Sequence, residues 1–199
     1  MNTVIFDIGQ VLISWHPQRA FARVMPEDEV EAFMERIGFA EWNHANDARP
    51  SAAEATEELV ARFPDDEAGI RAYVGHFGAT ITDLVPGTIE IVDELEAAGV
   101  RLGALTNWAA DTFQVALGMH DLLDRFAEIV VSGREGVTKP NPEIFLLACS
   151  RLGVAPESAV FVDDSPANVA GAKAVGMTGL LFRSAEQLRA DLVALGLLA

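Results

Sequence analysis

The stretch Thr3-Val4-Ile5-Phe6-Asp7-Ile8-Gly9 decides how the rest of the sequence is interpreted. Its first four residues are β-branched or aromatic, which is typical of a strand, and the apolar run Val4 to Phe6 is typical of a strand buried on both faces. Ligands of open parallel sheets bind at the carboxyl ends of the strands. Asp7, which follows the strand at once, is therefore the first candidate for a functional residue.

Strand-like and helical patterns alternate in the second half of the chain. This alternation predicts βαβ units and an α/β, Rossmann-like fold, with a mainly parallel sheet and helices on both faces. Strands are expected at 100–105, 127–131, 159–162 and 178–182, and helices at about 88–98, 110–118, 142–152, 166–175 and 185–195.

Residues 15–80 show helical periodicity and no strand pattern. Apolar side chains recur at i, i+3, i+4 and i+7 from Val30 to Ile37 and again from Ile70 to Phe77. Further helices are expected near 18–25 and 52–62. Because this segment interrupts the α/β pattern directly after the first strand, we expect an α-helical cap at 15–80 inserted into a core of residues 1–14 and 81–199.

The composition is that of a globular protein with an acidic surface. Acidic side chains outnumber basic ones by 30 to 14, for a formal net charge of −16, which argues against nucleic acid and anionic membranes as partners. We expect no membrane span and no signal peptide. The single cysteine, Cys149, excludes an internal disulfide, fits a cytoplasmic location and is expected to pack in the core.

Polar residues that could take part in catalysis or binding follow several of the expected strands. Thr106 and Asn107 follow the strand at 100–105, and the adjacent acids Asp163 and Asp164 follow the strand at 159–162. Lys139 precedes Pro140-Asn141-Pro142, where Asn141 is expected to cap a helix that begins at Pro142. Two adjacent carboxylates repel each other unless a cation is present, so the acid pair is the sharpest of these signals.

The order of these motifs resembles that of the haloacid dehalogenase-like (HAD) hydrolases, in the subgroup with a helical cap. The motifs are Phe-Asp-x-Gly-x-Val-Leu, Leu-Thr-Asn, Lys-Pro-x-Pro and Val-Asp-Asp-Ser-x-x-Asn, and the resemblance covers essentially the whole chain. It implies that Asp7 attacks a phosphate ester and becomes transiently phosphorylated. It also implies that Thr106 and Asn107 donate hydrogen bonds to the phosphoryl oxygens, with Lys139 beside nucleophile and phosphate.

The resemblance further implies a Mg²⁺ cofactor. Its ligands would be the Asp7 carboxylate, the backbone carbonyl of Gly9 and Asp164, with Asp163 nearby or bonded through water. Three aspartates and a phosphate dianion would otherwise bring five negative charges together, against one positive charge on Lys139.

Gly9 departs from the pattern of most phosphatases in this superfamily, which carry a second aspartate there to protonate the leaving alcohol. One reading is a phosphatase similar to sugar-phosphate phosphatases with the same Asp-x-Gly start, acting on a small phosphorylated substrate. Its acid would then come from water or from another residue, with His16 and His44 as candidates. A 2-haloacid dehalogenase and a non-catalytic phosphate-binding protein remain alternatives.

The substrate pocket is expected to lie between the cap and the strand ends. His16, Arg19, His44 and Trp108 are the candidate lining residues, and Trp15, Trp42 and Asp47 are expected near the pocket mouth. Trp15 and Trp42 would equally suit the core of the cap. The sequence leaves the substrate and the oligomeric state open.

Overall fold

The computed structural model describes residues 2–199 and contains one fully parallel, five-stranded sheet. The strands are β1 (Thr3–Phe6), β2 (Arg101–Thr106), β3 (Ile129–Val131), β4 (Ala159–Asp163) and β5 (Thr178–Leu181). Their order is β3-β2-β1-β4-β5, so β1 is the central strand and the connections run outward from it in opposite directions. The predicted Rossmann-like sheet is confirmed.

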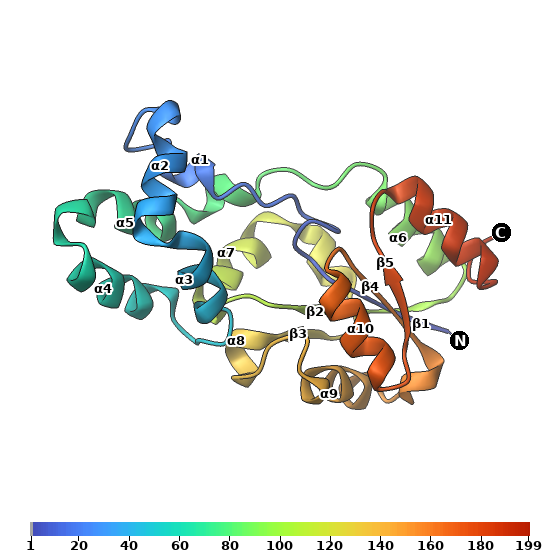
Figure 1. Cartoon of the computed structure of the whole chain (residues 1–199). Coiled ribbons are helices and arrows are strands. Elements are labelled where there is room, and N and C mark those ends of the chain that lie inside the picture. Colours follow the sequence, from blue (N-terminus) through green and yellow to red (C-terminus); the bar gives the residue numbers. More distant parts are fainter. Residues whose placement is uncertain (1) are drawn as a thin grey trace.

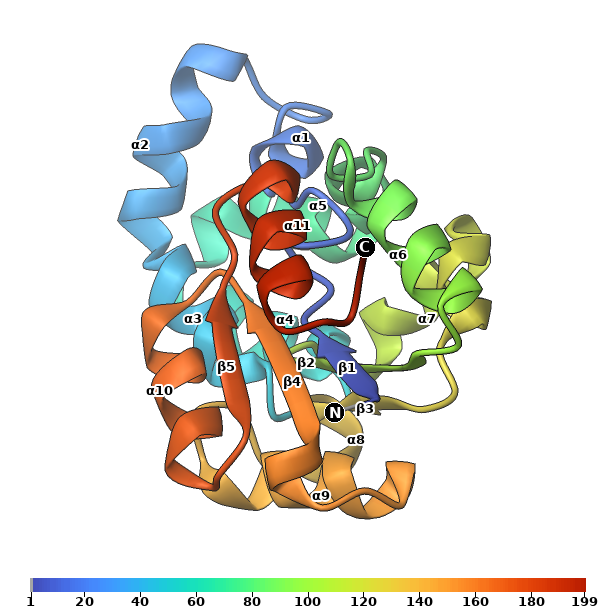
Figure 2. The same cartoon turned by 90° about the vertical axis from the view of Figure 1, so that its right-hand side faces the viewer.

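Helices cover both faces of the sheet, as predicted (Figures 1 and 2). On one face lie α6 (Thr88–Ala97), α7 (Ala110–Met119) and α11 (Ala185–Ala194), and on the other α9 (Pro142–Leu152) and α10 (Pro166–Ala174). Side chains of β1 alternate between the two: Val4 and Phe6 join the first core and Ile5 the second. Cys149 is buried in the second core and is free, as expected.

Local signals end and begin the core helices where the sequence predicted. Asn141 caps α9 by accepting a hydrogen bond from the backbone N–H of Glu143 at 3.0 Å, with Pro142 as the first helical residue. Gly99, just after α6, has φ of +74°, the left-handed conformation that glycine adopts without a Cβ clash.

Five helices lie between β1 and α6, on the side of the sheet toward which β1 runs (Figure 1). They are α1 (Gln18–Phe21), α2 (Glu27–Ile37), α3 (Phe39–Asn46), α4 (Ala52–Arg62) and α5 (Glu67–Gly75). Helix α3 is absent from the sequence prediction, because Phe39-Ala-Glu-Trp-Asn-His-Ala-Asn46 contains too few apolar residues to show a helical period. Short 3₁₀ helices at Pro64–Asp66 and Phe77–Ile81 complete the segment.

An aromatic cluster joins these helices to the sheet layer. Tyr73 packs edge-on against Phe77 at 5.5 Å between ring centroids, Phe77 against Trp108 at 5.7 Å, and Trp108 against Phe113 of α7 at 5.5 Å. One apolar core therefore runs from the helical segment into the α/β layer. The division into a cap and a core at 15–80 stays a prediction.

No helix within residues 2–199 has both the length and the apolar character needed to cross a lipid bilayer.

Asp111, at the start of α7, ties the helical segment to the α/β layer. Its carboxylate accepts hydrogen bonds from the first two N–H groups of α4, Ala52 at 3.0 Å and Ala53 at 3.2 Å, and from the Ser51 hydroxyl at 3.2 Å. A carboxylate at a helix N-terminus satisfies N–H groups that have no partner inside the helix.

Asp111→Ala should therefore lower the free energy of unfolding by about 0.5–2 kcal/mol, the usual cost of losing a helix cap. Urea unfolding measures this change. Asp124→Ala is the matched control, because Asp124 is exposed and makes no comparable bond among the described residues. Equal free energies of unfolding for the two variants would show that the hydrogen bonds of Asp111 do not stabilise the protein.

Candidate active site

Asp7 lies where the strand order reverses, at the carboxyl end of β1 and beside β4. Its backbone N–H donates to the carbonyl of Val162 at 2.8 Å, which continues the β1–β4 ladder by one residue. Its Oδ1 accepts hydrogen bonds from the N–H of Ile8 at 2.7 Å and from Lys139 Nζ at 2.8 Å. Within the described part of the chain Oδ2 has no hydrogen-bond partner, so one oxygen is held while the other is free to react.

Lys139 is the buried cation of the site, with 1% of its side chain exposed. Its Nζ lies 2.8 Å from Asp7 Oδ1, 2.7 Å from Asp163 Oδ2 and 3.1 Å from the carbonyl oxygen of Leu105. Three acceptors thus satisfy the three donors of the ammonium group.

Asn107 positions Lys139. Its side-chain oxygen accepts from the backbone N–H of Lys139 at 2.8 Å, and its Nδ2 donates to the backbone carbonyl of Lys139 at 3.0 Å. The contact of Asn107 with a phosphoryl group stays a prediction, whereas this bidentate link is a role that the sequence reading missed. Thr106 ends β2, is buried, and lines the same cavity as Asp7.

The two acids after β4 have different environments. Asp163 is fully buried and accepts bonds from Lys139, from the Ser165 N–H at 2.8 Å, and from Asn168 Nδ2 at 3.0 and 3.1 Å. Asp164 is exposed and lines the cavity. One ligand oxygen from each of Asp7, Asp163 and Asp164 can be chosen so that all lie within 4.8 Å of one another, which a single cation could bridge. Since Asp163 is already saturated with donors, Asp7 and Asp164 are the more available ligands.

Burial sets the electrostatics of this group. Burial raises the pKa of Asp7 to about 7, against the opposing effect of the Lys139 ammonium, and Asp163 adds to the rise. Burial lowers the pKa of Lys139, but Asp7 and Asp163 outweigh it, so that the pKa lies above its ordinary value. Burial and the neighbouring Asp163 raise the pKa of Asp164. A divalent cation beside these carboxylates would favour their charged forms.

A cavity of about 260 Å³ opens above Asp7. Trp15, Trp42, Asp47 and Trp108, which the sequence analysis named, line this cavity, and so does Gly9 beside the metal-binding candidates. The sequence reading missed several further lining residues, which are Gln10, Asn43, Asn46, Tyr73, Phe77 and Asn168. Asn168 belongs to the last motif and was recognisable there. Asn46 is buried, and its Nδ2 has no hydrogen-bond partner among the described residues, so it could donate to a ligand.

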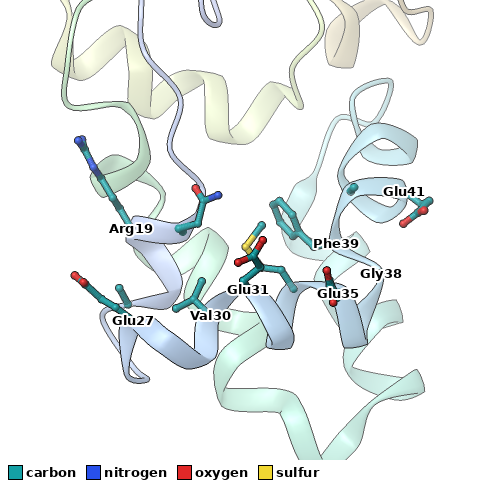
Figure 3. Close-up of a pocket in the computed structure, with 12 residues that line it drawn as sticks. Arg19, Glu27, Val30, Glu31, Glu35, Gly38, Phe39 and Glu41 are labelled. Carbon is teal, nitrogen blue, oxygen red and sulfur yellow. The ribbon is translucent and has the colours of Figure 1, made fainter.

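Three predicted pocket residues do not line this cavity. Arg19 pairs with Asp83 at 2.6 Å and lines a different groove of about 760 Å³, whose other walls carry Glu27, Glu31, Glu35 and Glu41 (Figure 3). The backbone of His16 bonds to Thr80. His44 lies on α3, whose helical period turns residues 42, 43, 46 and 47 toward the cavity and leaves His44 exposed. The placement of His44 depended on α3, a helix that the sequence did not reveal.

Comparison with known proteins settles the family. The family model of the haloacid dehalogenase-like hydrolases matches residues 1–176. The chain belongs to this family. Over its whole length it is 29% identical to a phosphoglycolate phosphatase of Rhodospirillum rubrum, covering 86% of that protein. It is 39% identical to a glyceraldehyde 3-phosphate phosphatase of Methanopyrus kandleri, over 49% of this chain and 42% of that protein. The chain therefore matches less than half the length of the latter relative.

Solved structures of HAD enzymes share the fold. A HAD-like family hydrolase from Porphyromonas gingivalis is 23% identical, with a TM-score of 0.74 over 98% of this chain and 97% of that one. A HAD family enzyme from Bacteroides thetaiotaomicron, in complex with magnesium and inorganic phosphate, is 19% identical, with a TM-score of 0.66 over 92% of this chain and 95% of that one. At such identities the likeness shows the fold alone.

Replacing Lys139 tests how far this HAD site depends on its buried cation. Lys139→Met leaves two buried carboxylates without their cation, which should cost about 3–5 kcal/mol of unfolding free energy at pH 8. The pKa of Asp7, already raised to about 7, should rise further, so the neutral form becomes available as the pH falls. The deficit should therefore shrink toward pH 5.

Chemical unfolding at the two pH values measures this. The exposed Lys173, the other lysine of the chain, provides the control variant Lys173→Met, which should change stability little at either pH. A Lys139→Met deficit that is the same at pH 5 and pH 8 would contradict the charge argument.

Proposed function

We propose that this chain hydrolyses a phosphate monoester of a small molecule, with Mg²⁺, through a phosphoryl group carried transiently by Asp7. One observation carries the proposal: Asp7 lines the cavity, its Oδ1 is held by Lys139 and the Ile8 N–H, and its Oδ2 has no partner among the described residues. A carboxylate held in this way is oriented for attack on an atom bound above it.

The residues present fit a magnesium ion. Asp7, Asp164 and the backbone carbonyl of Gly9 are the proposed ligands, since magnesium prefers oxygen ligands and retains several waters. Asp163, whose oxygens accept bonds from Lys139, Ser165 and Asn168, would lie beside the ion and orient Lys139. When bound, the ion would neutralise charge on the phosphoryl oxygens and on Asp7.

Residues of the chain would then bind the phosphoryl group and position the groups that react with it. Lys139 neutralises Asp7 and the incoming phosphate, Thr106 donates a hydrogen bond to a phosphoryl oxygen, and Asn107 holds Lys139 in place while its amide lines the cavity. The helical segment 15–80 would act as a cap, since Trp15, Trp42 and Tyr73 form the wall opposite the strand ends. A cavity of about 260 Å³ suits a small phosphorylated metabolite, and a cytoplasmic location fits the free, buried Cys149.

The phosphatases among the relatives favour this reading over the alternatives. A 2-haloacid dehalogenase needs neither a metal nor a pair of acids at the end of β4, and here Asp163 and Asp164 both lie within metal-binding reach of Asp7. A non-catalytic phosphate-binding protein would keep the lysine and the metal ligands but would have no need of a nucleophile with a free oxygen.

Asp7→Asn tests the nucleophile. The amide has nearly the same shape but attacks phosphorus too slowly to be useful, so release of inorganic phosphate from p-nitrophenyl phosphate should fall at least about 10³-fold. Asp65→Asn, on the exposed surface, should leave the rate unchanged. Activity of Asp7→Asn above a few per cent of wild type would rule out Asp7 as the nucleophile.

Metal linkage gives an independent test that does not rely on turnover. Mg²⁺ binds the folded acid cluster and not the unfolded chain, so saturating Mg²⁺ at 100 times its Kd should stabilise the protein by about 2.7 kcal/mol. Differential scanning fluorimetry should show the rise in Tm for wild type and its loss in Asp164→Ala. A Tm that Mg²⁺ does not move in wild type would favour the dehalogenase alternative, which release of chloride from 2-chloropropionate in EDTA would then establish.

A further inference from the structure

Gly9 leaves the proposed reaction without an acid on the chain segment that carries the nucleophile, but another carboxyl group lies in the same cavity. Asp47 comes directly after α3 and lines the cavity together with Asp7, Lys139 and Asp164. Only 18% of its side chain is exposed. It comes from the helical segment, whereas Asp7 and Asp164 come from the ends of strands, so residues from both parts of the chain line one cavity.

The backbone around Asp47 is fastened to the α/β layer. The Ser132 hydroxyl donates to the carbonyl oxygen of Asp47 and accepts from the backbone N–H of Trp108 at 2.8 Å. Two residues on, the carbonyl of Arg49 accepts from the N–H of Ala110 at 3.3 Å. These bonds connect Asp47 directly to the Thr106-Asn107-Trp108 segment, so its position relative to the strand ends is fixed by the fold and not by an independent surface loop.

The Asp47 carboxyl group has an environment opposite to that of Asp7. Among the described residues no donor hydrogen-bonds to its side chain, and the nearest basic side chain is the exposed His44, with Nδ1 3.9 Å from Asp47 Oδ2. Lys139 lines the same cavity, but its three N–H donors are directed to Asp7, Asp163 and the carbonyl oxygen of Leu105. Tyr73, on α5, is the remaining titratable neighbour and donates its hydroxyl proton to Asn43.

Burial raises the pKa of Asp47 to about 7, Lys139 opposes the rise, and Asp7 adds to it. The two carboxyl groups of this cavity differ in their hydrogen-bond partners. Asp7 has a lysine and a backbone N–H bound to one oxygen, which orients and stabilises its charged form. Asp47 has neither bond. The pKa of both carboxyl groups is raised to about 7, so the contrast between them lies in these contacts: a cation bound to Asp7 would further favour its charged form, whereas Asp47 can carry a proton near neutral pH and act as a general acid.

We propose that Asp47 is the catalytic general acid and base of this site, supplying from the helical segment the carboxyl group that Gly9 does not provide. The proposal rests on the phosphatase function proposed above. It assigns to the segment 15–80 a chemical role in addition to enclosing the substrate.

The proposed reaction has two steps. Asp7 Oδ2 forms a bond to phosphorus, the bond from phosphorus to the ester oxygen breaks, and the Asp47 proton goes to that oxygen, which leaves as an alcohol. Asp47, now a carboxylate, then takes a proton from water as the water oxygen attacks the phosphorus. The bond from phosphorus to Asp7 breaks, inorganic phosphate leaves, and both aspartates return to their starting states.

The test compares two substrates of similar shape, phenyl phosphate and p-nitrophenyl phosphate, whose leaving groups differ in their need for a proton. In Asp47→Asn, kcat/KM for phenyl phosphate should fall about 10²- to 10⁴-fold, and kcat/KM for p-nitrophenyl phosphate by less than about tenfold. Because the second step also loses its base, p-nitrophenol should appear in a burst while phosphorylated enzyme accumulates. Loss of structure alone would produce neither the substrate difference nor the burst.

Restoring a carboxyl group at position 9 gives a more specific test. A Cβ at Gly9 meets no atom within 4 Å, and Gly9 is not among the residues with positive φ, so an aspartate fits there. The double variant Gly9→Asp/Asp47→Asn should recover at least about tenfold in kcat/KM for phenyl phosphate relative to Asp47→Asn. His44→Ala, which removes the neighbouring histidine, should leave the ratio of the two substrates as in wild type.

If Asp47→Asn fails to fold, the pH dependence of the wild-type enzyme still tests the proposal. Its kcat/KM for phenyl phosphate should decline above about pH 7, where Asp47 loses its proton, while that for p-nitrophenyl phosphate should decline less. An unchanged substrate ratio in folded Asp47→Asn, or equal pH profiles for both substrates, would overturn the role of Asp47. If Asp7→Asn is inactive in the same assays, the proposed phosphatase function survives that result, whereas an active Asp7→Asn would overturn the function itself.

Discussion

The buried contact of Lys139 with Asp7 and Asp163 is the constraint on which the rest of the site depends. Placing three charged groups in the interior is costly unless they satisfy one another, and here one ammonium group joins two carboxylates and a backbone carbonyl at 2.7–3.1 Å. Asn107 fixes the lysine backbone, and Ser165 and Asn168 complete the hydrogen bonds of Asp163. Four strand ends and loops must therefore adopt one arrangement for any of these charges to be tolerated.

The sheet order explains why these groups meet. Asp7 ends the central strand β1, Asp163 ends its neighbour β4, and Thr106 ends β2 on the other side. Parallel strands bring all three ends to the same edge, and the reversal of strand order at β1 opens a crevice there. Aromatic side chains and Asp47 from the segment between β1 and α6 line the cavity at this crevice. In the proposed function, this segment would both exclude water from the site and supply the carboxyl group that transfers protons.

Much of this was predictable because its signals are local in the sequence. Each strand is a short apolar run, and Asp7, Thr106, Asp163 and Asp164 stand at the ends of such runs, where they could be identified together. Lys139 follows no strand directly and was identified from the Lys-Pro-x-Pro motif. Helix α3 could not be predicted, because its cavity face consists of Trp42, Asn43 and Asn46, continued by Asp47 just after the helix, and lacks an apolar stripe. Without it, His44 could not be distinguished from Asp47 by distance to the site. The link from Asn107 to the Lys139 backbone spans 32 residues and required the fold.

The covalent chemistry at Asp7 is the central claim, and one measurement tests it most directly. Enzyme mixed with p-nitrophenyl phosphate and Mg²⁺ is quenched in acid during turnover, treated with borohydride, which reduces an acyl phosphate to an alcohol, and digested for peptide mass spectrometry. If Asp7 is the nucleophile, Asp7 alone should be converted to homoserine, and only when substrate and Mg²⁺ are both present. Catalytic turnover with an unmodified Asp7, or with the conversion at another acidic residue, would contradict it.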